Sequence, residues 1–124
     1  VLLEPGKLAR TAEIGTSIED LQNAVDGLIE PFYPFEEQVC IVCNDEGKIN
    51  GMLPNRSVKN KDGVMVDFIF GPAFICDCRG ESFDSLSDEQ IARYTKMFRY
   101  PEHLARLNGK LIGIPFNPQR EHER

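Results

Sequence analysis

The sequence contains no tryptophan and only two histidines, and it has no long uninterrupted apolar stretch. No apolar run approaches the roughly 18 to 20 residues that a helix needs to cross a bilayer, and the first residues do not have the profile of a signal peptide. We therefore predict a cytoplasmic protein that does not associate with membranes. Of the two possible imidazole bases, His122 lies in a charged C-terminal stretch and His103 in an expected short helix.

The familiar catalytic and nucleotide-binding motifs are also missing. There is no glycine-rich dinucleotide-binding turn, no phosphate-binding loop and no serine nucleophile elbow. The run from Asn44 to Gly47 resembles the start of a calcium loop, but the twelfth position counted from Asn44 is Asn55 rather than the required Glu. We therefore predict no catalytic residues, no metal site and no cofactor, and an enzyme is the less favoured interpretation.

Positive charge is scarce in the first half of the chain. Residues 1–50 hold ten acidic and three basic side chains, a balance of −7, whereas the whole chain carries −6. An acidic surface repels phosphate backbones, and no run of Lys or Arg interrupts it. We therefore expect no direct nucleic-acid binding. The ordinary role of such an imbalance is solubility.

Four cysteines form two close pairs, Cys40 with Cys43 and Cys76 with Cys78. The spacing of these cysteines resembles that of a zinc site with four thiolate ligands. Both pairs lie inside apolar, strand-like runs, and side chains alternate between faces along a strand, so Cys40 and Cys43 should point to opposite sides. We predict buried, reduced thiols, which suit a cytosolic protein. Zinc binding and a disulfide or redox pair are the alternatives.

The length of 124 residues leaves room for one domain with one core. Runs of strands followed by helical segments indicate an α+β fold rather than a regular alternation. We predict a single domain over residues 1–116, followed by a frayed charged tail at 117–124. Its expected architecture is a mostly antiparallel sheet of hairpins, with one N-terminal helix and a C-terminal helical segment packed on it.

Helix starts are marked by two capping boxes. Thr16 with Glu19 predicts the first helix, and Ser87 with Gln90 predicts the second. Pro101 can open a further short helix at its first position. The expected strands cover residues 1–3, 9–14, 38–43, 48–53, 64–70, 73–78 and 110–116.

Tight turns at residues 44–47 and 60–63 should each close a hairpin. Residues 54–56 are expected to break the first of these ladders.

The stretch from Asn44 to Arg56 is the most interesting part of the chain. Asn44 and Asn55 bring side-chain amides to the expected hairpin, and Arg56 brings a planar fork of five donors suited to a carboxylate or phosphate. With Tyr33 nearby, these residues are the candidate binding residues. The alternative is ordinary turn chemistry, in which Asn caps its own backbone and Arg56 pairs with an acidic neighbour.

Several segments resemble, in order and spacing, the domain of unknown function 3846 family. They are EPFYPF (30–35), VCNDEGK (42–48), LPNR (53–56), GPAFI (71–75) and the run 83–90, so that the resemblance spans roughly residues 1–100. Cys43, Asn55 and Arg56 match the family pattern, whereas the other cysteines have no fixed counterpart, which weakens the zinc interpretation.

The resemblance implies a setting rather than a mechanism. Members are small proteins of gut bacteria, phages and conjugative elements, without an established activity, and relatives occur alongside or joined to antirestriction-type domains. This implies an accessory role in the biology of mobile elements.

Three hypotheses follow from the sequence. The first is a non-enzymatic interaction domain with a protein partner, serving a phage or mobile element. The second is an acidic nucleic-acid mimic of antirestriction type. The third is a small-ligand binder or enzyme centred on the Asn44–Arg56 hairpin.

Overall fold

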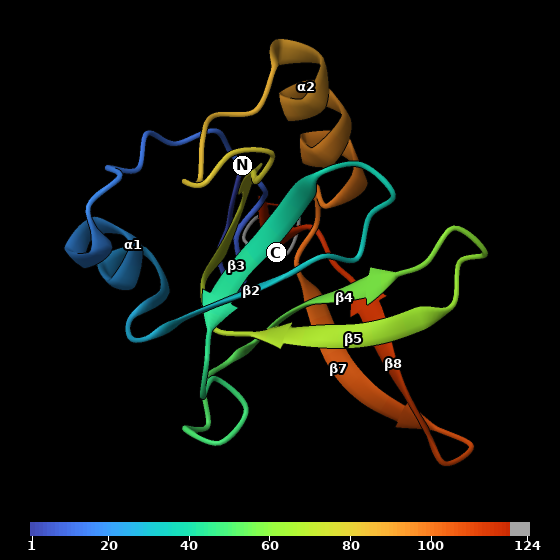
Figure 1. Cartoon of the computed structure of the whole chain (residues 1–124). Coiled ribbons are helices and arrows are strands. Elements are labelled where there is room, and N and C mark those ends of the chain that lie inside the picture. The colour runs from blue at the N-terminus through green and yellow to red at the C-terminus, as the bar shows by residue number, and fades with distance from the viewer. Residues whose placement is uncertain (120–124) are drawn as a thin grey trace.

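The computed structural model describes residues 1–119, which form an α+β fold around a four-stranded antiparallel sheet (Figure 1). The strand order is β1-β6-β3-β2. The strands are β1 (Leu2–Leu3), β2 (Ile29–Phe32), β3 (Val39–Asn44) and β6 (Ala73–Asp77). Two further antiparallel ladders join β4 (Pro54–Lys59) to β5 (Met65–Phe70) and β7 (Glu102–Leu107) to β8 (Lys110–Pro115).

The central strands β3 and β6 are apolar on both faces because both faces of the sheet are covered. One face packs against helix α1 (Ile18–Val25), through a cluster that contains Leu21, Val25, Cys40, Val42 and Phe74. The other packs against helix α2 (Asp88–Met97) and the β4–β5 hairpin, through a cluster that includes Ile41, Ile75, Val58, Ile69 and Tyr94. The core is therefore two thin layers separated by one sheet.

Helix α1 begins one residue later than the sequence pattern indicated. Its N-cap is Ser17 rather than Thr16, and the Ser17 hydroxyl accepts a hydrogen bond from the Asp20 backbone N–H at 3.1 Å. Either residue type can cap a helix. The helix ends at Asp26, which adopts the left-handed conformation with φ of 59°.

Helix α2 confirms its predicted capping box. The Ser87 hydroxyl accepts from the Gln90 backbone N–H at 3.2 Å, and the Gln90 side chain accepts from the Ser87 N–H at 2.9 Å. Neither helix of the described structure is long and apolar enough to cross a membrane.

The predicted hairpin at residues 44–56 is wrong. Strand β3 pairs with β2 and β6 instead, and residues 45–53 form successive turns, closed by Asn50 N–H to the Glu46 carbonyl at 2.8 Å. Pro54, Asn55 and Arg56 open strand β4 rather than breaking a ladder. Proline is tolerated as the first residue of a strand because it has no N–H to contribute.

The predicted helix after Pro101 is also wrong. Strands β7 and β8 form a hairpin there, and His103 lies in β7, stacked on Phe116 with ring centroids 3.9 Å apart. The deciding signal is Asn108-Gly109, whose φ angles of 51° and 80° give the two-residue turn that matches strand twist. The expected strand at 9–14 is reduced to one bridge between Leu2 and Arg10.

Candidate functional site

Arg56, the strongest predicted binding residue, is completely buried. Its guanidinium donates to four backbone carbonyls, those of Lys7 (2.6 Å), Phe98 (2.6 Å), Glu4 (3.2 Å) and Arg99 (3.5 Å). These carbonyls belong to the N-terminal segment and to the segment that leaves α2. The five-donor fork thus joins three distant parts of the chain.

Asn55 is buried beside Arg56 and has a similar role. Its amide donates to the Leu3 and Gly71 carbonyls at 3.0 and 2.8 Å, and its oxygen accepts from Arg56 at 2.5 Å. Burial lowers the pKa of Arg56 to about 10, and the nearby charge of Glu102 opposes this shift. Arg56 therefore stays protonated at neutral pH, as its contacts with carbonyl oxygens require.

Asn44 and Tyr33 lie apart from this pair. The Asn44 amide donates to the Val25 and Asp26 carbonyls at the end of α1, at 3.0 and 3.1 Å, and its oxygen accepts from the Glu46 N–H at 2.8 Å. Tyr33 is 63% exposed. The structure therefore brings together two of the four predicted residues, and it uses the amides and the guanidinium to hold backbone.

A cleft of about 710 Å³ lies elsewhere, between α2, the tip of the β4–β5 hairpin, the segment 34–37 and the start of β7. Its apolar lining includes Phe35, Tyr94, Met97 and Phe98. The Phe35 ring lies 4.8 Å from the Tyr94 ring and 6.2 Å from the Phe98 ring, measured between centroids. Met97 is 57% exposed. The cleft thus has an apolar lining in which Tyr94 and Phe98 are largely buried and Met97 is exposed.

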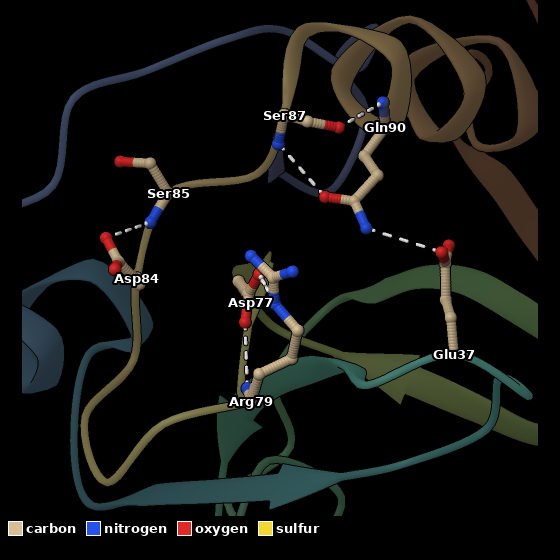
Figure 2. Close-up of polar contacts among 7 residues, drawn as sticks. All are labelled: Glu37, Asp77, Arg79, Asp84, Ser85, Ser87 and Gln90. Carbon is tan, nitrogen blue, oxygen red and sulfur yellow. Dashed lines mark hydrogen bonds and ion pairs between the residues drawn. The ribbon is translucent and has the colours of Figure 1, made fainter.

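Glu37 is held in this cleft by donors from α2. Its carboxylate accepts from the Tyr94 hydroxyl, from the Arg93 guanidinium at 2.6 Å and from the Gln90 amide at 3.3 Å. Figure 2 shows Gln90 turned toward Glu37 while its oxygen stays on the backbone of Ser87. The capping box therefore also positions a donor for the cleft.

These contacts shift two pKa values in opposite directions. The Tyr94 hydrogen bond, followed by those from Gln90 and Arg93, holds the pKa of Glu37 below its usual value against the effect of burial. Burial and the bond to Glu37 raise the pKa of Tyr94. At neutral pH the site therefore contains a carboxylate and a neutral phenol.

The floor of the cleft contains a second engaged carboxylate. The Ser57 hydroxyl donates to Glu102 at 2.6 Å, and the Ser57 backbone N–H donates to the same oxygen at 3.2 Å. Lys59 and Lys61 line the rim, and Lys61 lies 3.9 Å from Glu36. The cleft thus combines an apolar lining with charges of both signs.

Sequence reasoning missed the cleft because its partners are far apart in the chain. Glu37 and Gln90 are separated by 53 positions, and Ser57 and Glu102 by 45. Gln90 carried a sequence signal, but for helix capping alone. The sequence signal that lies nearest the cleft is the EPFYPF segment (30–35), of which Pro34 and Phe35 line the cleft.

The cysteines confirm the prediction that Cys40 and Cys43 point to opposite faces. Cys40 packs with Cys76 on the α1 side, with sulfur atoms 3.7 Å apart, while Cys43 packs on the other side. All four thiols are free. The hydrogen bond with Cys76 and burial raise the pKa of Cys40, and burial raises the pKa of Cys43 to about 11. Over residues 1–119, no group of three or more His, Cys, Asp or Glu is arranged to hold a metal ion.

The acidic residues of the first half are spread over several elements. Glu4 pairs with Arg10 on the N-terminal segment, Glu37 lies in the cleft, and Glu30 lies in a separate pocket of about 230 Å³ beside Asp45. A hydrogen bond between the Glu30 and Asp45 carboxyls raises the pKa of Glu30. The acids therefore do not form one row.

The family model described as Domain of unknown function (DUF3846) matches residues 1–99. The chain belongs to this family. No curated protein and no solved structure matches it. The DUF3846 match includes most of the cleft lining but ends before Glu102, so the β7–β8 hairpin and the floor carboxylate lie outside the matched residues.

Proposed function

We propose that this DUF3846 domain is a non-enzymatic interaction module that serves a phage or conjugative element in the bacterial cytosol. In this proposal it holds a segment of a protein partner in the cleft between α2 and the β4–β5 hairpin. The observation that carries the proposal is the cleft itself, about 710 Å³ with Phe35, Tyr94, Met97 and Phe98 in its lining. The family resemblance supports the mobile-element setting.

The chemistry of the lining supports binding rather than turnover. Tyr and Phe supply large contact areas with few rotatable bonds, and Met adapts to irregular shapes. The two carboxylates best placed for acid–base work are engaged, Glu37 by three donors and Glu102 by Ser57. A general acid or base needs a proton that it can exchange with substrate, whereas a lowered pKa and three donors suit a fixed acceptor.

A crosslinking experiment can test this proposal. A photoreactive amino acid placed at Met97 should crosslink to one reproducible protein in lysate from cells that carry the parent element. The same probe at Val66, which is 55% exposed against 57% for Met97 and does not line the cleft, is the matched control. We expect the adduct at Met97 and not at Val66.

A pair of charge substitutions adds a second readout. Met97→Lys should reduce co-purification of that partner at least tenfold, because it places a charge on the apolar wall, and Val66→Lys should leave it unchanged. Equal loss or equal retention in the two variants would contradict binding in the cleft. The absence of any reproducible partner under mild salt would count against an interaction module altogether.

The nucleic-acid mimic gains no support from the distribution of acids. A mimic needs carboxylates along one face at phosphate-like intervals. Here Glu4, Glu37 and Asp67 are each neutralised by a basic side chain on a different part of the fold. We therefore keep one proposed function.

A further inference from the structure

The outer edge of strand β8 is an open row of backbone donors and acceptors. In the β7–β8 hairpin, Leu107 faces Lys110 across a two-residue turn, and such a closing pair exchanges both backbone hydrogen bonds. Bonded pairs then alternate with non-bonded pairs along the ladder, so even-numbered residues of β8 bond to β7. The bond from Phe116 N–H to the Pro101 carbonyl, at 3.0 Å, fits this alternation.

The backbone groups of Leu111 and Gly113 therefore point away from β7. Within residues 1–119, β8 has no other strand beside it, since its ladder contains β7 and β8 alone. Figure 1 shows the hairpin turn projecting from the rest of the molecule. An edge of this kind is a template for another strand.

Between Lys110 and Pro115, the side chains of β8 do not protect this edge. Natural edge strands are commonly blocked by charges, inward-pointing lysines or bulges, yet residues 111–116, LIGIPF, contain no charged residue, and the β7–β8 register is regular. Leu111 and Ile114 are 47% and 45% exposed. Pro115 blocks one donor near the end of the strand, and the donors of Leu111 and Gly113 stay available.

We propose that β8 pairs antiparallel with β8 of a second copy of this chain. A two-fold axis at Gly113 lets each Gly113 N–H bond to the Gly113 carbonyl of the other copy. Each Leu111 N–H then bonds to the Pro115 carbonyl of the other copy, and this pair makes one bond rather than two because proline has no N–H. The two hairpins become one four-stranded sheet, β7-β8-β8-β7.

The absence of charge along residues 111–116 suits a second copy as the occupant, because this edge pairs with itself without bringing like charges together. The chain carries −6 overall, so most contacts between two copies bring like charges together. In this register the uncharged residues 111–115 face one another, and Lys110 lies opposite the Phe116 of the other copy. A two-stranded ribbon also gains stability when it becomes part of a wider sheet. The pairing area is small, so we expect a reversible dimer with a dissociation constant on the order of 10 to 100 μM.

The dimer would contain two clefts, one in each chain. Glu102, at the start of β7, lines the cleft and so links it to the paired hairpins. Two linked sites raise the apparent affinity for a partner that presents two copies of its segment. The dimer itself does not depend on the proposed function, since β8 is separate from the aromatic wall of the cleft.

Amide hydrogen exchange on the unmodified full chain tests the pairing directly. Between about 5 μM and 1 mM protein, a range that spans the expected dissociation constant, exchange at the Leu111 and Gly113 amides should slow by about four- to ninefold, because the fraction of monomer falls by that factor. The Ile112 and Ile114 amides, bonded to β7, should be protected at both concentrations. Sedimentation equilibrium over the same range should show the mass rising from one chain toward two.

Two substitutions at one position separate backbone pairing from side-chain contact. Leu111→Pro removes an edge N–H that does not bond β7, and it should leave a monomer, whereas Leu111→Ala keeps the N–H and should still dimerise. Circular dichroism confirms that each variant is folded. A wild-type chain that stays monomeric at 1 mM, or that dimerises without slowing exchange at Leu111 and Gly113, would overturn the proposal.

Discussion

Arg56 is the residue whose interpretation changes most between sequence and structure. A guanidinium at an expected hairpin indicates ligand binding, but here the hairpin is absent and the ligands are four carbonyls of the chain itself. A buried charge of this kind stabilises a fold only while its donors are hydrogen-bonded. Removing some of the guanidinium donors leaves buried carbonyls without a hydrogen-bond partner. Asn55, which accepts from Arg56, is held by the same arrangement.

We predict that Arg56→Lys lowers the free energy of unfolding by about 3 kcal/mol or more, because an ammonium group cannot reach carbonyls on three segments at once. Urea denaturation measures this loss. Arg106→Lys is the control, since Arg106 donates to one exposed carbonyl, that of Gly109 at 3.3 Å, and should change stability by no more than about 0.5 kcal/mol. Equal stability of Arg56→Lys and wild type would show that the carbonyl contacts are dispensable.

The contacts of Glu37 lead to a prediction about how the stability of the fold changes at acidic pH. Its folded-state pKa lies below the unfolded value of 4.5, so its contribution is present above that value and is lost as the pH falls through the lower, folded pKa. Glu37→Gln should therefore lower the melting temperature at pH 7 by about 3 to 5 °C, and the difference from wild type should shrink on acidification toward pH 3.

Scanning calorimetry from pH 7 to pH 3 checks both effects. Glu36→Gln is the neighbouring control, because Glu36 is well exposed and its ion pair with Lys61 is 3.9 Å long, which contributes little to stability. If the two variants show the same pH dependence, the contacts of Glu37 with Tyr94 and Arg93 do not contribute in solution.

At the scale of elements, sequence signals between neighbouring residues predict most of the helices and turns. They fail where the pairing of distant strands determines the structure. The Ser87 capping box and the turn at 60–63 depend on neighbouring residues, and both are confirmed. Residues 48–53 carry a strand-like pattern, but β3 already has β2 and β6 on its two sides, so no edge is left for them. Pro101 predicts a helix start, whereas the nearby Asn108-Gly109 turn closes the β7–β8 hairpin.

The candidate site is even harder to predict from the sequence than the strands are. Phe35 directly follows Pro34 in the sequence, whereas Tyr94 and Phe98 belong to α2 and its C-cap, so the sequence does not group the aromatic residues of the cleft. The bonds that shape the cleft join Glu37 to α2 and Ser57 to β7. No periodicity or spacing encodes contacts between segments that the fold alone brings together.

At the scale of the whole molecule, the four-stranded sheet and the two core layers that cover it surround all four cysteines. Thiolate is the reactive form. Burial raises the pKa of Cys43 to about 11 and also raises that of Cys78, and the hydrogen bond with Cys76, followed by burial, raises that of Cys40. Each sulfur lies against one of the two thin core layers. Full reaction of the thiols therefore requires the layers to separate from the sheet.

We predict that a chromogenic disulfide reagent at pH 7.5 modifies the native thiols at least a hundredfold more slowly than those of the urea-unfolded chain, where all four react at once. The destabilised Arg56→Lys chain should react faster by the same factor by which its lost stability raises the population of opened molecules, because modification then follows that population. Fast native reaction at Cys43 or Cys78 that is unaffected by Arg56→Lys would show that local opening, rather than separation of the layers, exposes these sulfurs.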